Sequence, residues 1–347
     1  MPAPSRRVPS RLPLAAAVVG LVALLGAVAA FAMAGGGGGD GLPAPPSASV
    51  LDRELAAARR PDPAVPEARP RRFDAAAALR LVRDQLAVGQ RPSGSDRLAR
   101  VRARLVRRLP LGRTEAVAGH PGLVNVVGRI PARGTGRGRP AIVLAAHYDT
   151  QLAPRGFVGA NDSAAGTAVV VGAARSLLAA DRRERVRAAR NGDPPPSRRE
   201  VRFVLLDGEE LPPGGSEARF EQDGLRGSTA YAAAHGAQLG AVAVVDYVAG
   251  RGLRLPREGQ SDPALWRRVR AAAVRVGVAT AFPDAPGPTI SDDHVPFLRR
   301  GVPAVDLIDW SYPYKQGLED RLRRLSERAI DATGETMVDW LIAERKR

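Results

Sequence analysis

Two short segments of this chain place a histidine and several carboxylates directly after apolar runs. His147-Tyr148-Asp149 follows the run 141–146, and Asp207-Gly208-Glu209-Glu210 follows the run 201–206. Short β-prone runs of this kind predict buried strands of a parallel sheet. Because ligands of open α/β sheets bind beyond the carboxyl ends of the strands, these polar residues are placed where chemistry is expected.

Two further carboxylates complete a candidate metal site. Asp162 lies in the small-residue turn 159–163, and Asp246 ends a third apolar run. Imidazole and carboxylate groups suit zinc, and a carboxylate shared by two ligand sets can bridge two metal ions, as in two-metal aminopeptidases. Each segment alone is weak evidence for a metal site, since an adjacent pair of glutamates is usually solvated. Their combination after three apolar runs predicts a metal centre.

The elements that must position these residues alternate along the chain. Strands are expected at 123–130, 141–146, 201–206, 241–246 and 302–308, and helices at 73–88, 96–109, 163–179, 263–277 and 326–345. We expect Asp162 to cap the helix that begins at Ser163, and the charged segment 181–200 to form an exposed loop. The alternation predicts a three-layer α/β sandwich with a mixed, mostly parallel central sheet.

The N-terminal segment 1–34 contains an uncharged apolar run, Leu14–Ala34, preceded by three arginines. Its length matches the roughly 20 residues that a helix needs to span a bilayer. The positive flank predicts a single-pass anchor with the rest of the chain outside the cytoplasm. Ala32-Met33-Ala34 also resembles a signal-peptidase site, so secretion after cleavage near Ala34 is the alternative. We favour the anchor because a cleaved signal usually has a shorter apolar core.

Residues 35–72 are rich in glycine and proline and are expected to form a linker that contains a short helix at 51–60. Residues 73–347 are expected to form one catalytic domain. The formal net charge of +16 does not predict nucleic-acid binding, because the arginines are spread along the chain and are not interleaved with aromatic residues. The absence of cysteine excludes disulfides, a thiolate nucleophile and cysteine-ligated zinc.

These segments resemble the M28 zinc-peptidase superfamily, and within it the glutaminyl-peptide cyclotransferases, or glutaminyl cyclases. The resemblance runs from about Phe73 to the C-terminus and includes the motifs above together with segments 91–95, 227–228 and 292–303. The last of these is distinctly cyclase-like. So is the length of the segment between Glu210 and Gly227, which is very short in the peptidases.

The resemblance implies a ligand set. In the peptidases, one zinc ion takes the residues that match His147, Asp162 and Asp246, and a second takes those that match Asp162, Glu210 and a late histidine. The cyclases keep one zinc ion, on the positions of Asp162, Glu210 and that histidine. The resemblance therefore implies one zinc ion, or two.

The resemblance also implies roles for residues around the metal. Glu209 matches the general acid/base, and Asp149 matches an acid that orients its neighbour from behind the ligands. Asp246 and Asp293 match acids that support proton transfer in the cyclases. His294 lies in the same motif and is expected beside the site without being a ligand.

The chain departs from the family where the late histidine belongs. A Trp-His-Thr motif is expected, but the sequence has Lys315-Gln316-Gly317, so Gln316 occupies the ligand position. A glutamine amide is a poor zinc ligand beside imidazole, which makes Gln316 a doubtful ligand. Three functions remain open, all directed at peptide N-termini. We rank a glutaminyl cyclase that converts N-terminal glutamine to pyroglutamate first, an M28 aminopeptidase second and a catalytically impaired, membrane-tethered peptide-binding protein third.

Overall fold

A computed structural model describes residues 41–347. The apolar run Leu14–Ala34 and the possible cleavage site near Ala34 lie outside the described residues. Within the described part, one helical segment, Ala160–Arg190, is long and apolar enough to cross a membrane, and 72% of its most apolar window is buried inside the domain. That segment is therefore a core element.

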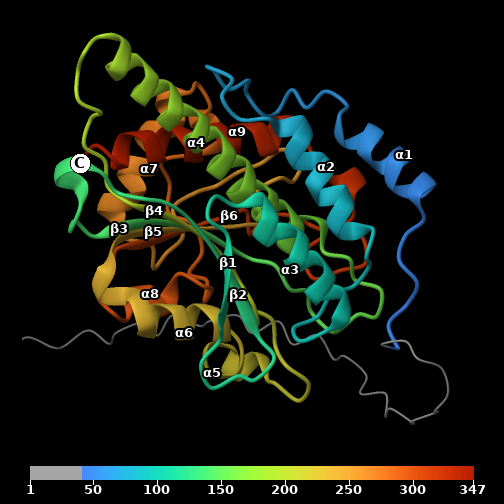
Figure 1. Ribbon diagram of the computed structural model, residues 1–347. Helices are drawn as coiled ribbons and strands as arrows, with labels where there is room; N and C mark the ends of the chain where they lie inside the picture. The colour runs from blue at the N-terminus through green and yellow to red at the C-terminus, as the bar shows by residue number, and fades with distance from the viewer. Residues whose placement is uncertain (1–40) are drawn as a thin grey trace, which may run out of the picture. The chain divides into compact units, whose positions relative to one another are not determined.

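A six-stranded sheet forms the centre of the fold (Figure 1). Its order is β1 (Arg113–Ala116), β2 (Val124–Ile130), β4 (Val201–Leu206), β3 (Ala141–His147), β5 (Leu239–Asp246) and β6 (Ala304–Ile308). The strands β4, β3, β5 and β6 are parallel, whereas β2 is antiparallel to both β1 and β4. The expected mixed, mostly parallel sheet is confirmed. The edge strand β1 was not expected, because its four residues carry no apolar run.

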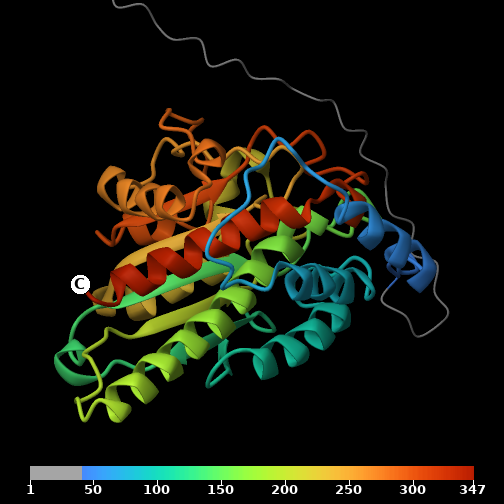
Figure 2. The same cartoon turned by 90° about the horizontal axis from the view of Figure 1, so that it is seen from above.

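Helices cover both faces of the sheet, as Figures 1 and 2 show. In β3, Ile142, Leu144 and Ala146 face the larger core, which is shared with α2 (Ala75–Leu86), α4 (Gly166–Arg190) and α9 (Glu327–Glu344). Val143 and Ala145 face the smaller core, shared with α6 (Arg226–His235) and α8 (Val295–Leu298). Because successive side chains of a strand point to opposite faces, one apolar run supplies both cores. The expected three-layer architecture is confirmed.

Most of the expected helices occur within a few residues of their expected bounds. The caps explain where they begin: the side chains of Asp74, Ser95, Asp262 and Ser326 accept first-turn N–H groups of α2, α3 (Asp96–Arg108), α7 (Pro263–Arg275) and α9. Two short elements that were not expected, η3 (Glu217–Arg219) and α5 (Phe220–Asp223), lie in the long segment between β4 and α6.

The helix α4 corrects two expectations. It continues to Arg190, so residues 181–190 are not an exposed loop. Asp181 is buried there and accepts hydrogen bonds from Arg133 (2.7 Å) and Arg345 (2.8 Å), which lets a charged segment stay helical against the domain. Asp162 is not a helix cap either. It has non-helical backbone angles in the turn Ala160–Ala165 that precedes α4, and its carboxylate is used elsewhere.

The helix α1 (Ala48–Ala58) differs from the expected linker over 35–72. Its side chains Leu51, Leu55 and Ala58 belong to the main core, and so do Val65 and Ala68 further along the chain. The spacing of the three helical residues forms one apolar stripe, which explains why a segment rich in proline and arginine still packs. From α1 onward the chain therefore belongs to the domain, which begins well before residue 73.

Candidate active site

The parallel strands bring the predicted site residues to one edge of the sheet. His147 is the last residue of β3 and is paired with Leu206 of β4, which directly precedes Asp207. Asp246 is the last residue of β5 and is paired with Ile308 of β6. Gly208, with φ of +78°, turns the chain sharply after β4, and a Cβ atom there would lie 2.5 Å from Leu123 Cδ2. Glu209 and Glu210 follow that turn.

Four carboxylates surround His147. Its Nε2 atom lies 3.2 Å from Asp162 Oδ1 and 3.5 Å from Asp246 Oδ1, and its Nδ1 atom lies 3.5 Å from Glu209 Oε2 and 3.6 Å from Asp149 Oδ1. The structure therefore brings together the histidine and acids that the sequence had placed on separate segments.

His147 and Asp162 form, together with Glu210, a group that suits a metal ion. One ligand atom each from His147, Asp162 and Glu210 lies within 4.8 Å of the others. Glu210 Oε1 and His147 Nδ1 are buried without a hydrogen-bond partner. Burying such groups is costly unless they are satisfied. One imidazole and two carboxylates match the donor set of zinc sites, so the residues present fit a zinc ion.

The electrostatics of the cluster agree with a cation site. Burial, reinforced by Asp162, raises the pKa of Glu210 well above its usual range, and burial raises the pKa of Asp246 to about 7. Burial alone would lower the pKa of His147, but the carboxylates around it, Glu209 first, raise it well above its usual value. Positive charge is therefore strongly favoured among these acids.

Asp162 is held at its carboxylate and at its backbone N–H group. Tyr247 donates its hydroxyl hydrogen to Asp162 Oδ2 at 2.6 Å. The buried carboxylate of Asp320 accepts the backbone N–H groups of Asn161 at 3.0 Å and Asp162 at 3.1 Å. Gly159 permits the turn, because its φ is +55° and a Cβ atom there would lie 1.7 Å from the carbonyl oxygen of Asp162.

Asp149 lies behind the cluster and contacts residues that belong to it. Its Oδ2 atom accepts hydrogen bonds from the Ser93 hydroxyl at 2.7 Å and from the Glu210 backbone N–H at 3.3 Å. Burial alone would raise the pKa of Asp149, but His147 and Ser93 lower it. Asp149 thus remains a carboxylate that orients both His147 and Glu210.

Arg91 holds the neighbouring loop. It is fully buried and donates hydrogen bonds to the carbonyl oxygens of Val158 (2.5 Å) and Gly159 (3.1 Å). Burial lowers the pKa of Arg91 to about 10. The segment 91–95 therefore serves the site through Arg91 and Ser93, which support the ligands without belonging to them.

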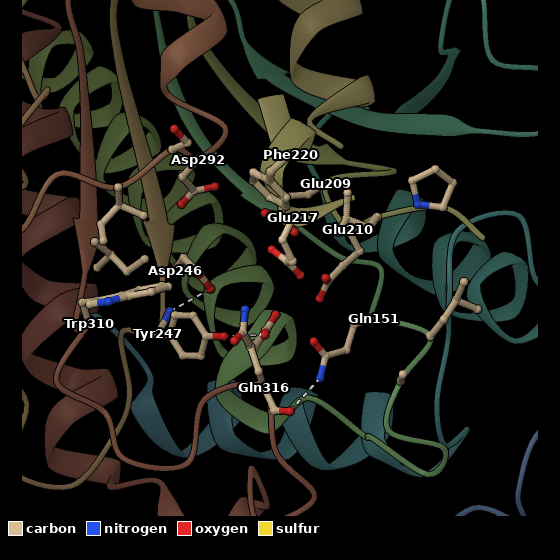
Figure 3. Close-up of a pocket in the computed structure, with 18 of the residues that line it drawn as sticks. Gln151, Glu209, Glu210, Glu217, Phe220, Asp246, Tyr247, Asp292, Trp310 and Gln316 are labelled. Atoms are coloured by element: carbon tan, nitrogen blue, oxygen red, sulfur yellow. Dashed lines mark hydrogen bonds between the residues drawn. The ribbon is translucent and has the colours of Figure 1, made fainter. Parts of the chain in front are cut away.

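A pocket of about 500 Å³ opens beside the cluster (Figure 3). Phe220, Tyr247, Ile290, Ile308 and Trp310 give it apolar walls, and the segment 211–214 covers it from one side. The acids Asp162, Glu209, Glu210, Glu217, Asp246 and Asp292 also line it. This volume and this mixture of apolar walls and convergent polar groups are typical of a small-ligand site.

Gln316 lines the same pocket, which agrees with its expected position beside the acids. It has φ of +59°, and its backbone carbonyl oxygen accepts a hydrogen bond from Gln151 Nε2 at 3.0 Å. Figure 3 shows its side chain projecting into the pocket. The neighbouring Lys315 does not line the pocket, and its ammonium group lies 5.2 Å from the ring centroid of Trp310.

Two expected residues lie elsewhere. Asp293 is fully buried and does not line the pocket, whereas Asp292 does, so the acid expected from the motif is displaced by one residue. His294 is not beside the metal cluster. Its Nε2 atom lies 3.1 Å from Glu258 Oε2, and Glu258 in turn accepts the backbone N–H groups of Gln260 and Ile290. His294 therefore supports the loops at the pocket rim.

Sequence reasoning missed Tyr247, Asp292 and Asp320. Tyr247 directly follows Asp246 at the end of β5, and this position was the available signal for it. Asp292 directly precedes Asp293, the acid that the resemblance implied for this role. Asp320 has no local signal, because its role depends on a contact with a turn far away in the sequence.

Comparisons with known proteins find several similar structures. A glutaminyl cyclase from an Acidobacteriales bacterium has 27% sequence identity and a TM-score of 0.66, and the match covers 80% of this chain and 97% of that one. A Porphyromonas gingivalis glutaminyl cyclase has 22% identity and a TM-score of 0.66, with coverage of 79% and 100%. A leucine aminopeptidase precursor from Bacteroides thetaiotaomicron has 21% identity and a TM-score of 0.63, with coverage of 80% and 98%.

The family itself is identified by a direct match. Residues 125–341, more than half of the chain, match peptidase family M28. The matched range includes His147, Asp162, Glu210 and the acids around them. The relatives are enzymes that act on peptides, either by cyclisation or by hydrolysis. By its matched sequence and by its fold, the chain belongs to peptidase family M28.

Proposed function

We propose that this protein is a zinc-dependent glutaminyl-peptide cyclotransferase, which converts the N-terminal glutamine of a peptide to pyroglutamate and releases ammonia. The observation that carries the proposal is the hydrogen bond from Tyr247 to Asp162 Oδ2. A carboxylate that bridges two metal ions commonly gives one oxygen to each ion. Because Oδ2 of Asp162 already accepts the Tyr247 hydroxyl hydrogen, this carboxylate is less suited to bridging, which favours a one-metal centre. The cyclases use a single zinc ion, whereas the peptidases use two.

The pocket also supports a cyclase. Trp310, Phe220 and Ile308 offer apolar walls for the methylene groups of a glutamine side chain. The segment 211–220 adds a wall that the very short equivalent segment in the peptidases does not supply. The relative with 27% identity, from an Acidobacteriales bacterium, is itself a glutaminyl cyclase.

In this proposal His147, Asp162 and Glu210 would hold the zinc ion, so that His147 takes the place of the late histidine of the cyclases, and Gln316 is a neutral neighbour in the same pocket. The ion, when bound, would polarise the carbonyl group of the substrate's side-chain amide. The pocket residues hold the α-amine next to that carbonyl group, so the attack is intramolecular and loses little further entropy.

Glu209 moves the proton. The α-amine nitrogen forms a bond to the amide carbon while Glu209 accepts a proton from that nitrogen. The bond from the carbon to the amide nitrogen then breaks, and Glu209 gives the proton to the departing ammonia. Burial raises the pKa of Glu209 well above its usual range, which suits a group that must both accept and donate a proton. Asp246 and Asp292, which line the same pocket, hold the amine in place.

An M28 aminopeptidase is the second candidate, and one observation favours it. His147 Nε2 lies near both Asp162 Oδ1 and Asp246 Oδ1, and these three residues are the set that the resemblance assigns to the first zinc ion of the peptidases. In that case Glu209 activates water instead of the substrate's own amine.

One experiment separates these functions. A peptide that begins with glutamine is incubated with the purified protein, and its mass is then measured by mass spectrometry. The zinc content of the same protein preparation is also measured. A mass decrease equal to ammonia, with about one zinc per chain, is the cyclase result. Release of free glutamine with about two zinc ions is the peptidase result. An unchanged peptide with no zinc would refute both functions and leave a peptide-binding protein.

We also propose that Leu14–Ala34 anchors the protein in a membrane with the M28 domain outside the cytoplasm. The arginine-rich flank and the uncharged length of the run support this proposal. Fractionation tests it: the intact chain is expected in the carbonate-resistant membrane fraction. A soluble form that begins near residue 35 would instead support cleavage.

A further inference from the structure

The candidate active-site pocket is acidic from its interior to its mouth. Asp162, Asp246 and Asp292 are buried, Glu209 and Glu210 are partly buried, and Glu217 is exposed. Among the described residues that line this pocket, none carries a positive charge. Asp292, which is only 4% exposed, has an Oδ2 atom without a hydrogen-bond partner. A concave site lined by one sign of charge concentrates ligands of the opposite sign.

Glu217 is the acid at the mouth of the pocket. It begins the short turn η3, and within residues 41–347 its carboxylate makes no hydrogen bond or ion pair. The charged groups near it in the chain are already paired: Arg219 donates to Asp223 at 2.9 Å, and Glu221 accepts the Ser291 hydroxyl at 2.6 Å and pairs with Arg299. These pairs fix the segment while leaving Glu217 free to bind a ligand.

The rest of the wall suits a long, flexible cationic side chain. Phe220 lines the pocket together with Glu217 (Figure 3), and so does Pro212. Lysine and arginine lay their methylene groups along apolar surface and keep the charged end in water or near an acid. A pocket of about 500 Å³ is also within the range that admits a ligand larger than a single side chain.

We infer that Glu217 determines specificity for peptides that carry arginine or lysine directly after the N-terminal residue. This inference rests on the proposed function for the direction in which the peptide enters. The N-terminal residue lies among the inner acids, so the next side chain reaches the mouth, where Glu217 binds its positive charge.

Turnover of matched peptides tests the inference. Three tetrapeptide amides begin with glutamine and differ only in the second residue, which is arginine, alanine or glutamate. The wild-type kcat/KM is expected to be about threefold to tenfold higher for arginine than for alanine, and lower for glutamate than for alanine. Glu217→Gln should bring the arginine-to-alanine ratio close to one through KM, and Glu217→Lys should invert it. High salt should weaken the wild-type preference.

The matched control is Asp193→Asn, which removes the same charge from an exposed acid on the loop after α4, away from the pocket lining. It should retain the wild-type ratio. If Glu217→Gln also retained that ratio, or if wild type turned over all three peptides equally well, the inference would be wrong while the proposed function stood.

A binding experiment that needs no turnover tests the inference independently of the proposed function. The Glu209→Gln variant, with and without Glu217→Gln, is titrated with the arginine and alanine peptides, and binding is measured calorimetrically. Tighter binding of the arginine peptide that disappears with Glu217→Gln supports the inference whether or not the wild type is a cyclase. Equal binding of the two peptides, or no binding of either, overturns it.

Discussion

Tyr247 donates a hydrogen bond of 2.6 Å to one oxygen of Asp162, while the other oxygen of that carboxylate lies 3.2 Å from His147. The two oxygens of Asp162 therefore have different environments. One oxygen binds the hydroxyl group of Tyr247, and the other lies beside the histidine. This asymmetry supports the proposed one-metal centre, because one of the two oxygens already binds a protein group.

Replacing Tyr247 by phenylalanine tests this relationship. The change removes only the hydroxyl, so Asp162 loses a hydrogen bond that orients it. Outer contacts of this kind typically change metal affinity by about tenfold to a hundredfold, and we expect a loss of that size. Zinc affinity measured by chelator competition checks it, with circular dichroism as the folding control. Unchanged affinity would mean that Tyr247 does not orient the ligand.

Glu209→Gln tests the proton transfer. The variant keeps the size of the side chain but cannot accept a proton, so turnover should fall by roughly 10²–10⁴-fold. Zinc content should stay near the wild-type level, because Glu209 is outside the group His147, Asp162 and Glu210. Activity and metal analysis of one preparation check both points. Wild-type activity in the variant would refute the assigned role.

Gln316→His tests whether the pocket lacks a metal ligand. An imidazole at this position would add a strong donor beside Asp162 and Glu210, so zinc affinity should rise by at least roughly tenfold. Gln316→Asn is the matched control, since it changes the side chain without adding an imidazole. Chelator competition compares the three proteins. Equal affinities would show that residue 316 does not reach the ion.

The pair Glu258–His294 predicts a pH dependence of stability. Burial alone would raise the pKa of Glu258, but His294 and the backbone N–H groups of Gln260 and Ile290 lower it to about 2. An ordinary glutamate in the unfolded chain titrates near ~4.3. The stabilisation, on the order of 3 kcal/mol, is therefore fully present above ~4.3 and is lost as the pH falls towards about 2.

The measurement for this pair is the difference in free energy of unfolding between wild type and Glu258→Gln. The difference should be largest near neutral pH and should shrink in acid. Denaturant titrations at pH 6 and pH 2.5 provide both values. Asp193→Asn serves as a control for the loss of one charge. A difference of equal size at the two pH values would contradict the assignment.

Leu51→Ala tests whether α1 belongs to the domain. Leu51 is 1% exposed in the main core, so its truncation should lower the free energy of unfolding by about 2–5 kcal/mol. Leu111→Ala is the control, because Leu111 is 62% exposed and its truncation should change little. Thermal or denaturant unfolding checks both variants. Equal stability of the two would restore residues 35–72 as a linker.

The sequence by itself determined the architecture and the inner site. Apolar runs with polar residues at their ends predicted β3, β4 and β5, and the structure has His147, Glu209, Glu210 and Asp246 at or just after the ends of these strands, because strand periodicity and strand ends are local properties. Parallel pairing then brings those ends to one edge of the sheet. The sequence also identified Gln316 as the residue that departs from the family pattern.

Only the tertiary structure decided which groups complete the site. The choice between Asp292 and Asp293 depends on which way each side chain points, and a motif does not contain that information. The roles of Tyr247 and Asp320 depend on contacts between residues far apart in the chain. The core position of α1 has the same origin, since a proline-rich segment packs only where a partner surface exists. Local patterns fix elements, whereas long-range packing fixes what each side chain meets.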